Sequence, residues 1–206
     1  MYMGGLCFIT DRRTSRLSYE DMVLASLRAG VRWIQYRDKE RTRREIFVES
    51  VKLRSITREF NALLIVNDHP DIALATDADG VHLGQEDLPL KEARKIMGKD
   101  KLIGISTHNL EQAVEAGKSG ADYIGFGPMF PTVTKDAGSP RGISRLREMK
   151  DKVRVPIVAI GGITLNNVGT VLDAGADAVA VASAMLSGDM GENAKRFLEI
   201  IGTHGS

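Results

Sequence analysis

The chain of 206 residues is poor in cysteine and in aromatic residues, and each shortage excludes a class of site. Cys7 is the single cysteine, so neither an intrachain disulfide nor a zinc site with several cysteines can form. Aromatic residues make up 5% of the chain, too few for the stacking platforms on which single-stranded nucleic acid is bound. A lone cysteine suits a reducing compartment, and we expect a cytoplasmic protein.

The chain also has little net charge and no long apolar run. The formal net charge is +1 at pH 7, which creates no overall field toward nucleic acid or an acidic membrane. No apolar run approaches the roughly 18 residues of a membrane helix, and the opening MYMGGLCFIT does not have the form of a signal peptide. We therefore expect small molecules as partners, with no nucleic acid and no membrane. The oligomeric state stays open, a homo-oligomer included.

What the chain does contain is a regular alternation of two patterns, with no linker between them. Hydrophobic residues make up 43% of the sequence, enough for a large core, and we expect one domain over residues 1–206. Runs typical of strands cover residues 6–10, 31–37, 62–68, 80–84, 102–107, 122–127, 156–162 and 178–183. Apolar residues at helical spacing cover residues 19–28, 44–60, 70–76, 89–97, 110–119, 143–150, 165–174 and 191–200.

Strict alternation of this kind predicts a parallel sheet. A short repeat supports it: AGVRWIQY, ADGVHLG, SGADYIGFG and AGADAVAVAS each pass from a helix end to an apolar strand. We expect Gly30, Gly80, Gly120 and Gly175 to relieve the left-handed backbone at these helix ends. Eight units predict a compact α/β fold, the (β/α)8 TIM barrel. A doubly wound open sheet would carry a glycine-rich fingerprint after its first strand, where TDRRTS stands instead.

A barrel places its active site at the C-terminal ends of its strands. The second strand ends in Gln35 and Arg37, which share a face, and Lys39 follows. An amide beside two cations suits an anionic ligand with a hydrogen-bonding ring. The alternative is a solvated strand end with an ion pair to Asp38.

Two carboxylates, Asp68 and Asp87, follow the third and fourth strands. Oxygen ligands of this kind suit Mg²⁺, which retains water and binds substrate phosphates. The alternative is that each caps the N-terminus of the next helix. Nearby, His82 lies within a strand and is as readily a core residue as a ligand contact, and Ser106 at the end of the fifth strand can donate to a phosphate.

The remaining strand ends predict a lid and a second anion site. The segment from Pro128 to Arg141 is long for a connection and predicts a functional lid. At the ends of the seventh and eighth strands, the backbone around Gly161 and Gly162 and around Ala182 and Ser183 predicts a phosphate site. Tight packing is the alternative for the glycines. The lid contributes two hydroxyls and a cation over the leaving phosphate, from Thr132, Thr134 and Lys135.

Taken together, these segments resemble the thiamine-phosphate synthase family. The resemblance rests on QYRDK, VNDHPDIALATDADGVHLGQEDLP, FGPMFPTVTK and IVAIGGI, which occur in order over nearly the whole chain. It implies a transferase that joins hydroxymethylpyrimidine pyrophosphate to thiazole phosphate with Mg²⁺, through a dissociative step that releases pyrophosphate.

The resemblance also implies roles for the residues at matching positions. Asp68 and Asp87 would bind Mg²⁺, and Arg37, Ser106 and Lys135 would be catalytic. The lid would contribute Thr132, Thr134 and Lys135. With these three, the residues that would bind the two substrates are Gln35, Arg37, Lys39, Asn67, His82, Ser106, Thr132, Thr134, Lys135, Gly162, Ala182 and Ser183.

Two departures keep alternatives open. The segment from Lys135 to Gly142 is about one residue shorter than the family pattern, and a related thiazole tautomerase has a catalytic histidine where Pro128 stands. Proline cannot transfer a proton, which weakens the isomerase reading. A noncatalytic protein that binds thiazole phosphate or thiamine phosphate is the third reading.

Overall fold

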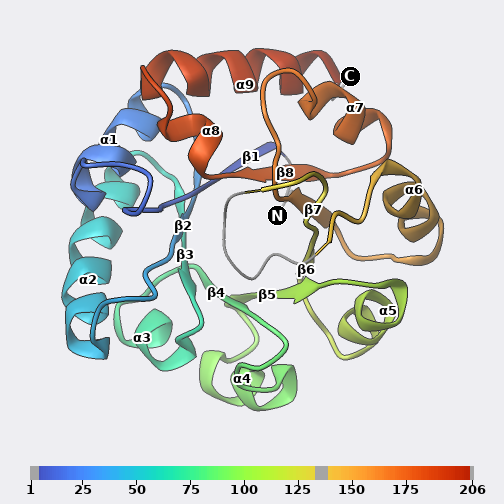
Figure 1. The fold of residues 1–206 in the computed structure, drawn as a ribbon. Helices are drawn as coiled ribbons and strands as arrows, with labels where there is room; N and C mark the ends of the chain where they lie inside the picture. Colours follow the sequence, from blue (N-terminus) through green and yellow to red (C-terminus); the bar gives the residue numbers. More distant parts are fainter. Residues whose placement is uncertain (1–4, 133–138, 205–206) are drawn as a thin grey trace.

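Eight parallel strands close into a barrel in chain order (Figure 1). The computed structural model describes residues 5–132 and 139–204. The strands are β1 (Gly5–Ile9), β2 (Trp33–Tyr36), β3 (Leu63–Asn67), β4 (Gly80–Leu83), β5 (Leu102–Thr107), β6 (Tyr123–Phe126), β7 (Ile157–Ile160) and β8 (Ala178–Val181). The predicted TIM barrel is therefore confirmed.

The helices form a ring outside the strands (Figure 1). They are α1 (Tyr19–Arg28), α2 (Arg43–Glu59), α3 (Pro70–Ala75), α4 (Leu90–Met97), α5 (Leu110–Lys118), α6 (Ile143–Lys152), α7 (Val168–Asp173), α8 (Ser183–Leu186) and α9 (Met190–His204). The sequence did not predict α8, because a helix of four residues is too short to show a period. Ala182 and Ser183 were expected in the eighth strand and instead lie where α8 begins.

Alternation along each strand divides the apolar side chains between two cores. In β2, Ile34 and Tyr36 pack in the layer between strands and helices. Trp33 belongs to a smaller core inside the barrel, where its ring meets the edge of Tyr123 at a centroid distance of 5.1 Å. The outer layer is larger and holds the helices on the barrel.

Three aspartates make the same set of contacts at the N-terminal ends of the strands, and we call this set of contacts the aspartate clasp. Asp79, Asp122 and Asp177 each precede a strand, and each accepts a hydrogen bond from the first amides of the strand before it, at 2.7 to 2.8 Å. Each also pairs with a cation on a helix, namely Arg54, Arg94 and Lys150. The clasp explains why the sequence repeats Ala-Asp at these positions.

The glycines expected at helix ends behave in two ways. Gly30, Gly120 and Gly175 have positive φ angles, as predicted. The prediction for Gly80 was wrong: Asp77 takes the left-handed conformation, and Gly80 lies in β4, where an added Cβ would come within 2.4 Å of the carbonyl oxygen of Leu102.

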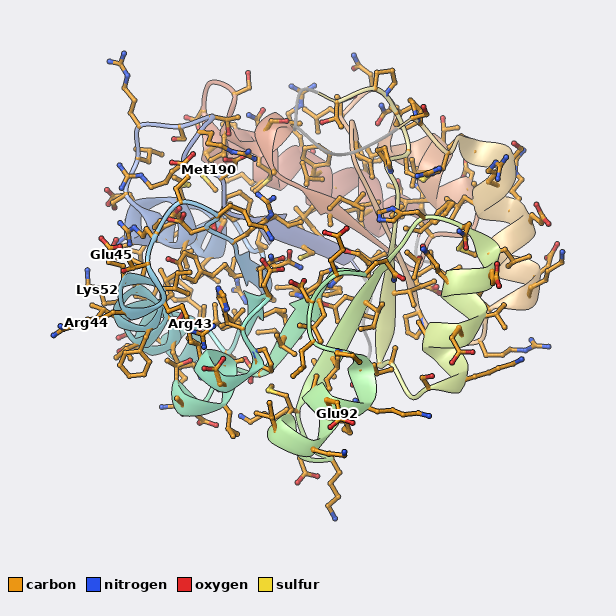
Figure 2. The ribbon with its side chains drawn as sticks, turned by 60° about the horizontal axis from the view of Figure 1, so that its bottom comes forward. Arg43, Arg44, Glu45, Lys52, Glu92 and Met190 are labelled. Carbon is orange, nitrogen blue, oxygen red and sulfur yellow. The ribbon has the colours of Figure 1, made fainter. Side chains whose placement is uncertain are left out.

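The outer face of α2 carries the charged side chains of Arg44 and Lys52 (Figure 2) and also the exposed apolar side chains of Phe47, Val48 and Val51. Within the described residues, no helix is both long and apolar enough to cross a membrane.

Candidate active site

A cavity of about 350 Å³ opens at the C-terminal ends of the strands. Its walls bring together Arg37 and Lys39 from the end of β2 and Ser106 from β5. Gly162, Ala182 and Ser183, from the ends of β7 and β8, also line it. Thr132 lines it as well, so the rule that a barrel binds ligands at this end brings seven of the predicted site residues to one cavity.

The floor beneath this cavity is a buried polar network. His82 is buried, its Nε2 lies 2.9 Å from Ser106 Oγ, and its Nδ1 lies 3.1 Å from the hydroxyl of Tyr123. Burial lowers the pKa of His82 to about 4, so its ring is neutral near pH 7 and can both donate and accept. The core reading of His82 is confirmed, and its contact with Ser106 links that core to the cavity.

Gln35 lies inside the barrel, deeper than the cavity that Arg37 and Lys39 line. It is buried, and it lines a void of about 20 Å³ inside the barrel together with His82 and Trp33. The indole Nε1 of Trp33 has no hydrogen-bond partner within the described part of the chain. The amide of Gln35 is therefore placed to meet the deepest part of a ligand rather than its charged end.

The two predicted metal ligands lie side by side. The carboxylates of Asp68 and Asp87 are within hydrogen-bonding distance of each other. Asp68 also accepts from Lys39 and, at 2.6 Å, from the side chain of Asn67. Burial and the neighbouring carboxylate of Asp68 raise the pKa of Asp87, while hydrogen bonds from Lys39 and the other partners outweigh burial and lower the pKa of Asp68.

Neither carboxylate caps a helix, so that alternative was wrong. The N-cap of α3 is His69, and the N-cap of α4 is Pro89. Asp68 instead has a φ angle of 67°, a left-handed conformation that few side chains adopt. Asp87 accepts a 2.6 Å hydrogen bond from the amide of Gly84 in the loop before α4. The left-handed backbone at Asp68 and the hydrogen bond from Gly84 to Asp87 thus hold the two carboxylates in place.

Two carboxylates in contact require a positive charge or a proton between them, and this arrangement fits Mg²⁺. Within the described residues, no group of three His, Cys, Asp or Glu side chains could hold a metal ion. A cation at Asp68 and Asp87 would therefore take its other ligands from water and substrate oxygens, as Mg²⁺ does.

The alternative reading of the second strand end was also wrong. Asp38 accepts a 2.6 Å hydrogen bond from the hydroxyl of Tyr19 and pairs with Arg41 at 3.5 Å. It does not pair with Arg37 or Lys39. Both cations line the cavity.

The end of the first strand also contributes to the site, which was not predicted from the sequence. Thr10 and Asp11 are buried and line the cavity beside Arg37. Asp11 is held by Arg13 through Nε and Nη2, both at 3.1 Å, and despite burial these bonds lower the pKa of Asp11. Applying the strand-end rule to the segment ITD would have found both residues.

Gly161 and Gly162 line the cavity, and packing also requires them. They have φ angles of 93° and 67°. An added Cβ would lie 2.6 Å from Pro128 Cβ at Gly161, and 2.6 Å from the carbonyl oxygen of Pro131 at Gly162. Only glycine lets β7 end this close to the segment that follows β6.

The lid is described only in part. Thr132 and Pro128 line the cavity. Thr134 and Lys135 lie outside the described residues, so their predicted roles remain predictions.

Comparison with known proteins decides the family. The family model for thiamine monophosphate synthase matches residues 6–185. The chain belongs to this family. The resemblance seen in the sequence is confirmed, and with it a transferase enzyme of thiamine biosynthesis.

Individual relatives agree over nearly the full chain. A thiamine-phosphate synthase of Chloroflexus aurantiacus is 46% identical over 186 residues, which cover 89% of this chain and 86% of the relative. One from Halalkalibacterium halodurans is 46% identical over 187 residues, covering 90% and 87%. The solved thiamine phosphate pyrophosphorylase of Pyrococcus furiosus has a TM-score of 0.91 and 41% identity, covering 98% of this chain and 97% of its own.

Proposed function

We propose that this synthase-family chain joins hydroxymethylpyrimidine pyrophosphate to thiazole phosphate and releases pyrophosphate. One observation supports this most directly: two cations line the cavity, Lys39 bonds to the carboxylate pair next to it, and a glycine-rich backbone lines another part of the same cavity. Two anionic groups can therefore be bound in different parts of one cavity, as two phosphorylated substrates require.

The residues suit a dissociative reaction. The C–O bond between the pyrimidine methylene and the pyrophosphate breaks, and the lone pair of the thiazole nitrogen then forms the new C–N bond. No proton needs to be removed, so no strong base is required. Arg37 and Lys39 would hold the departing pyrophosphate, and Mg²⁺ at Asp68 and Asp87 would neutralise charge on it.

The other residues would hold the organic parts of the substrates. Gln35 and the Ser106–His82 pair would meet the pyrimidine ring from the floor. The thiazole phosphate would lie against the backbone at Gly162, Ala182 and Ser183. Thr132, Thr134 and Lys135 would close over the cavity and keep out water, which would otherwise quench the cationic intermediate.

The tautomerase reading fits this site less well. Pro128 lines the cavity, where that enzyme needs a catalytic histidine. Of the two imidazoles here, His108 lines the cavity with its Nδ1 3.2 Å from the carbonyl oxygen of Gly127, and His82 below it is bonded through both ring nitrogens to Ser106 and Tyr123.

The test separates chemistry from binding. Asp87→Ala is expected to lower Mg²⁺-dependent turnover by at least a hundredfold, because one carboxylate of the pair is lost. The affinity for thiazole phosphate, measured by calorimetry, is expected to stay within twofold, since that substrate would lie against the backbone at Gly162, Ala182 and Ser183, away from Asp87. Glu86→Gln, an exposed neighbour, is the matched control. Full turnover by Asp87→Ala would remove Asp87 from the metal site.

A further inference from the structure

A second cavity adjoins the first and is not used by the chemistry described above. It has a volume of about 320 Å³ and lies between the segment that follows β1 and the segment that follows β2. Asp11, Arg37 and Lys39 line both cavities. We call this second space the side groove. Because the two spaces share these walls, the side chains of Arg37 and Lys39 are available to an anion in either space.

The side groove adds three more cations, and two of them are already bound. Arg13 is held by Asp11, and Arg41 is held by Glu49 at 2.6 Å. Arg12 is different: its guanidinium lies 5.8 Å from the centre of the Tyr19 ring. In the ranges that the structure describes, neither Arg12 nor Arg37 has a carboxylate within ion-pairing distance.

Most of the acidic groups in the side groove are engaged elsewhere. Asp38 accepts from the hydroxyl of Tyr19 and from the backbone amides of Glu40 and Arg41. Glu45 accepts from the amide and hydroxyl of Thr42, at the start of α2. These bonds hold both carboxylates on the loop and the helix. With Asp11 and the exposed Glu40, four carboxylates line the side groove against five cations, of which Arg12 and Arg37 have no carboxylate partner in the described ranges.

We propose that the side groove is a second anion site, which receives the inorganic pyrophosphate released in the central cavity and in which Arg12 is the outer cation. The proposal rests on the proposed function, because that reaction supplies the pyrophosphate. Transfer from Lys39 and Arg37 toward Arg12 moves the leaving group away from the reacting carbon. It thereby prevents recombination with the cationic intermediate and opens a route to solvent.

The test is product inhibition by inorganic pyrophosphate in the presence of Mg²⁺. Arg12→Gln is expected to raise the inhibition constant of pyrophosphate roughly fivefold, about the loss of one partly exposed charged hydrogen bond. Arg12→Lys keeps the charge and is expected to restore most of the effect. Arg16→Gln, an exposed arginine of the same segment that lines neither cavity, is the control and is expected to match the wild type.

A crystal of the wild-type protein soaked in pyrophosphate gives an independent readout. We expect density between Arg12 and Arg37. Density only beside Asp68 and Asp87, or equal inhibition constants for Arg12→Gln and the wild type, would overturn the side groove while leaving the synthase intact. If the wild type forms no thiamine phosphate, the proposed function fails instead, and pyrophosphate binding is then measured directly by calorimetry.

Discussion

At the scale of single residues, the site depends on backbone conformations that cannot be predicted from the sequence. Asp68 has a positive φ angle, and nothing in VNDHP distinguishes it from a helix cap. Strand-end position did predict Arg37, Lys39, Ser106 and the two carboxylates, because side-chain direction follows from the strand period. It could not predict depth: Gln35 shares a face with Arg37 along the strand but lies on the floor, inside the barrel.

His82 gives a prediction about pH and stability. Its pKa in the folded protein is about 4, below the ordinary value near 6.5. The unfolded chain therefore binds this proton first, and the folded state loses stability as pH falls from about 6.5 to 4, by roughly 3 kcal/mol in all. Above pH 6.5 the contribution is complete.

Urea unfolding between pH 7 and 5 measures this effect. The wild type is expected to lose about 1.4 kcal/mol per pH unit below 6.5 through this group, and His82→Gln is expected to lack that part of the slope. His204→Gln, exposed near the end of α9, is the control and keeps it. Identical slopes for His82→Gln and the wild type would show that the ring is protonated equally in both states.

At the scale of elements, the aspartate clasps are the clearest structural device. The repeat in the sequence signalled equivalent positions, and the alternation of periods predicted every strand and eight of the nine helices among the described residues. The role of Asp79, Asp122 and Asp177 was not predicted, because it depends on contact between neighbouring strands. The short α8 was missed because it has no period of its own.

The aspartate clasp gives a prediction in which the free energy of unfolding changes and turnover does not. Asp177→Ala removes the acceptor for the amide of Ile157 and the partner of Lys150. We expect the free energy of unfolding to fall by roughly 1–3 kcal/mol, with turnover at 25 °C unchanged, because the clasp lies at the end of the barrel opposite the site. Asp177→Asn keeps an acceptor and should cost less.

Thermal unfolding and the turnover assay together check this prediction. Asp151→Ala, an exposed acid on α6, is the matched control and should leave the free energy of unfolding within about 0.5 kcal/mol. A loss of turnover in folded Asp177→Ala would mean that the two ends of the barrel are coupled.

At the scale of the whole molecule, barrel closure converts separate strand ends into one site. Asp68 and Asp87 are 19 positions apart in the chain, yet their carboxylates lie within hydrogen-bonding distance of each other. Parallel strands in chain order place successive C-terminal ends beside one another, so the sequence could predict which residues meet. It could not predict that the segment after β1 would form a side groove against the segment after β2, since that depends on how two loops pack.

The predicted lid gives a prediction about closure of the whole site. Lys135→Ala is expected to lower turnover at least tenfold while changing the affinity for thiazole phosphate less than twofold, because the role we propose for this cation is to act on the leaving group. Rapid-mixing turnover and calorimetry measure the two quantities. Equal losses in both would mean that the lid only binds substrate.

The most direct measurement combines the purified protein with hydroxymethylpyrimidine pyrophosphate, thiazole phosphate and Mg²⁺, and follows thiamine phosphate by the fluorescence of its oxidised form. The account predicts product that disappears with EDTA and returns when Mg²⁺ is restored in excess. Product formed equally well in EDTA would contradict the role given to Asp68 and Asp87. No product under any metal condition, with thiazole phosphate still bound, would contradict the transferase assignment itself.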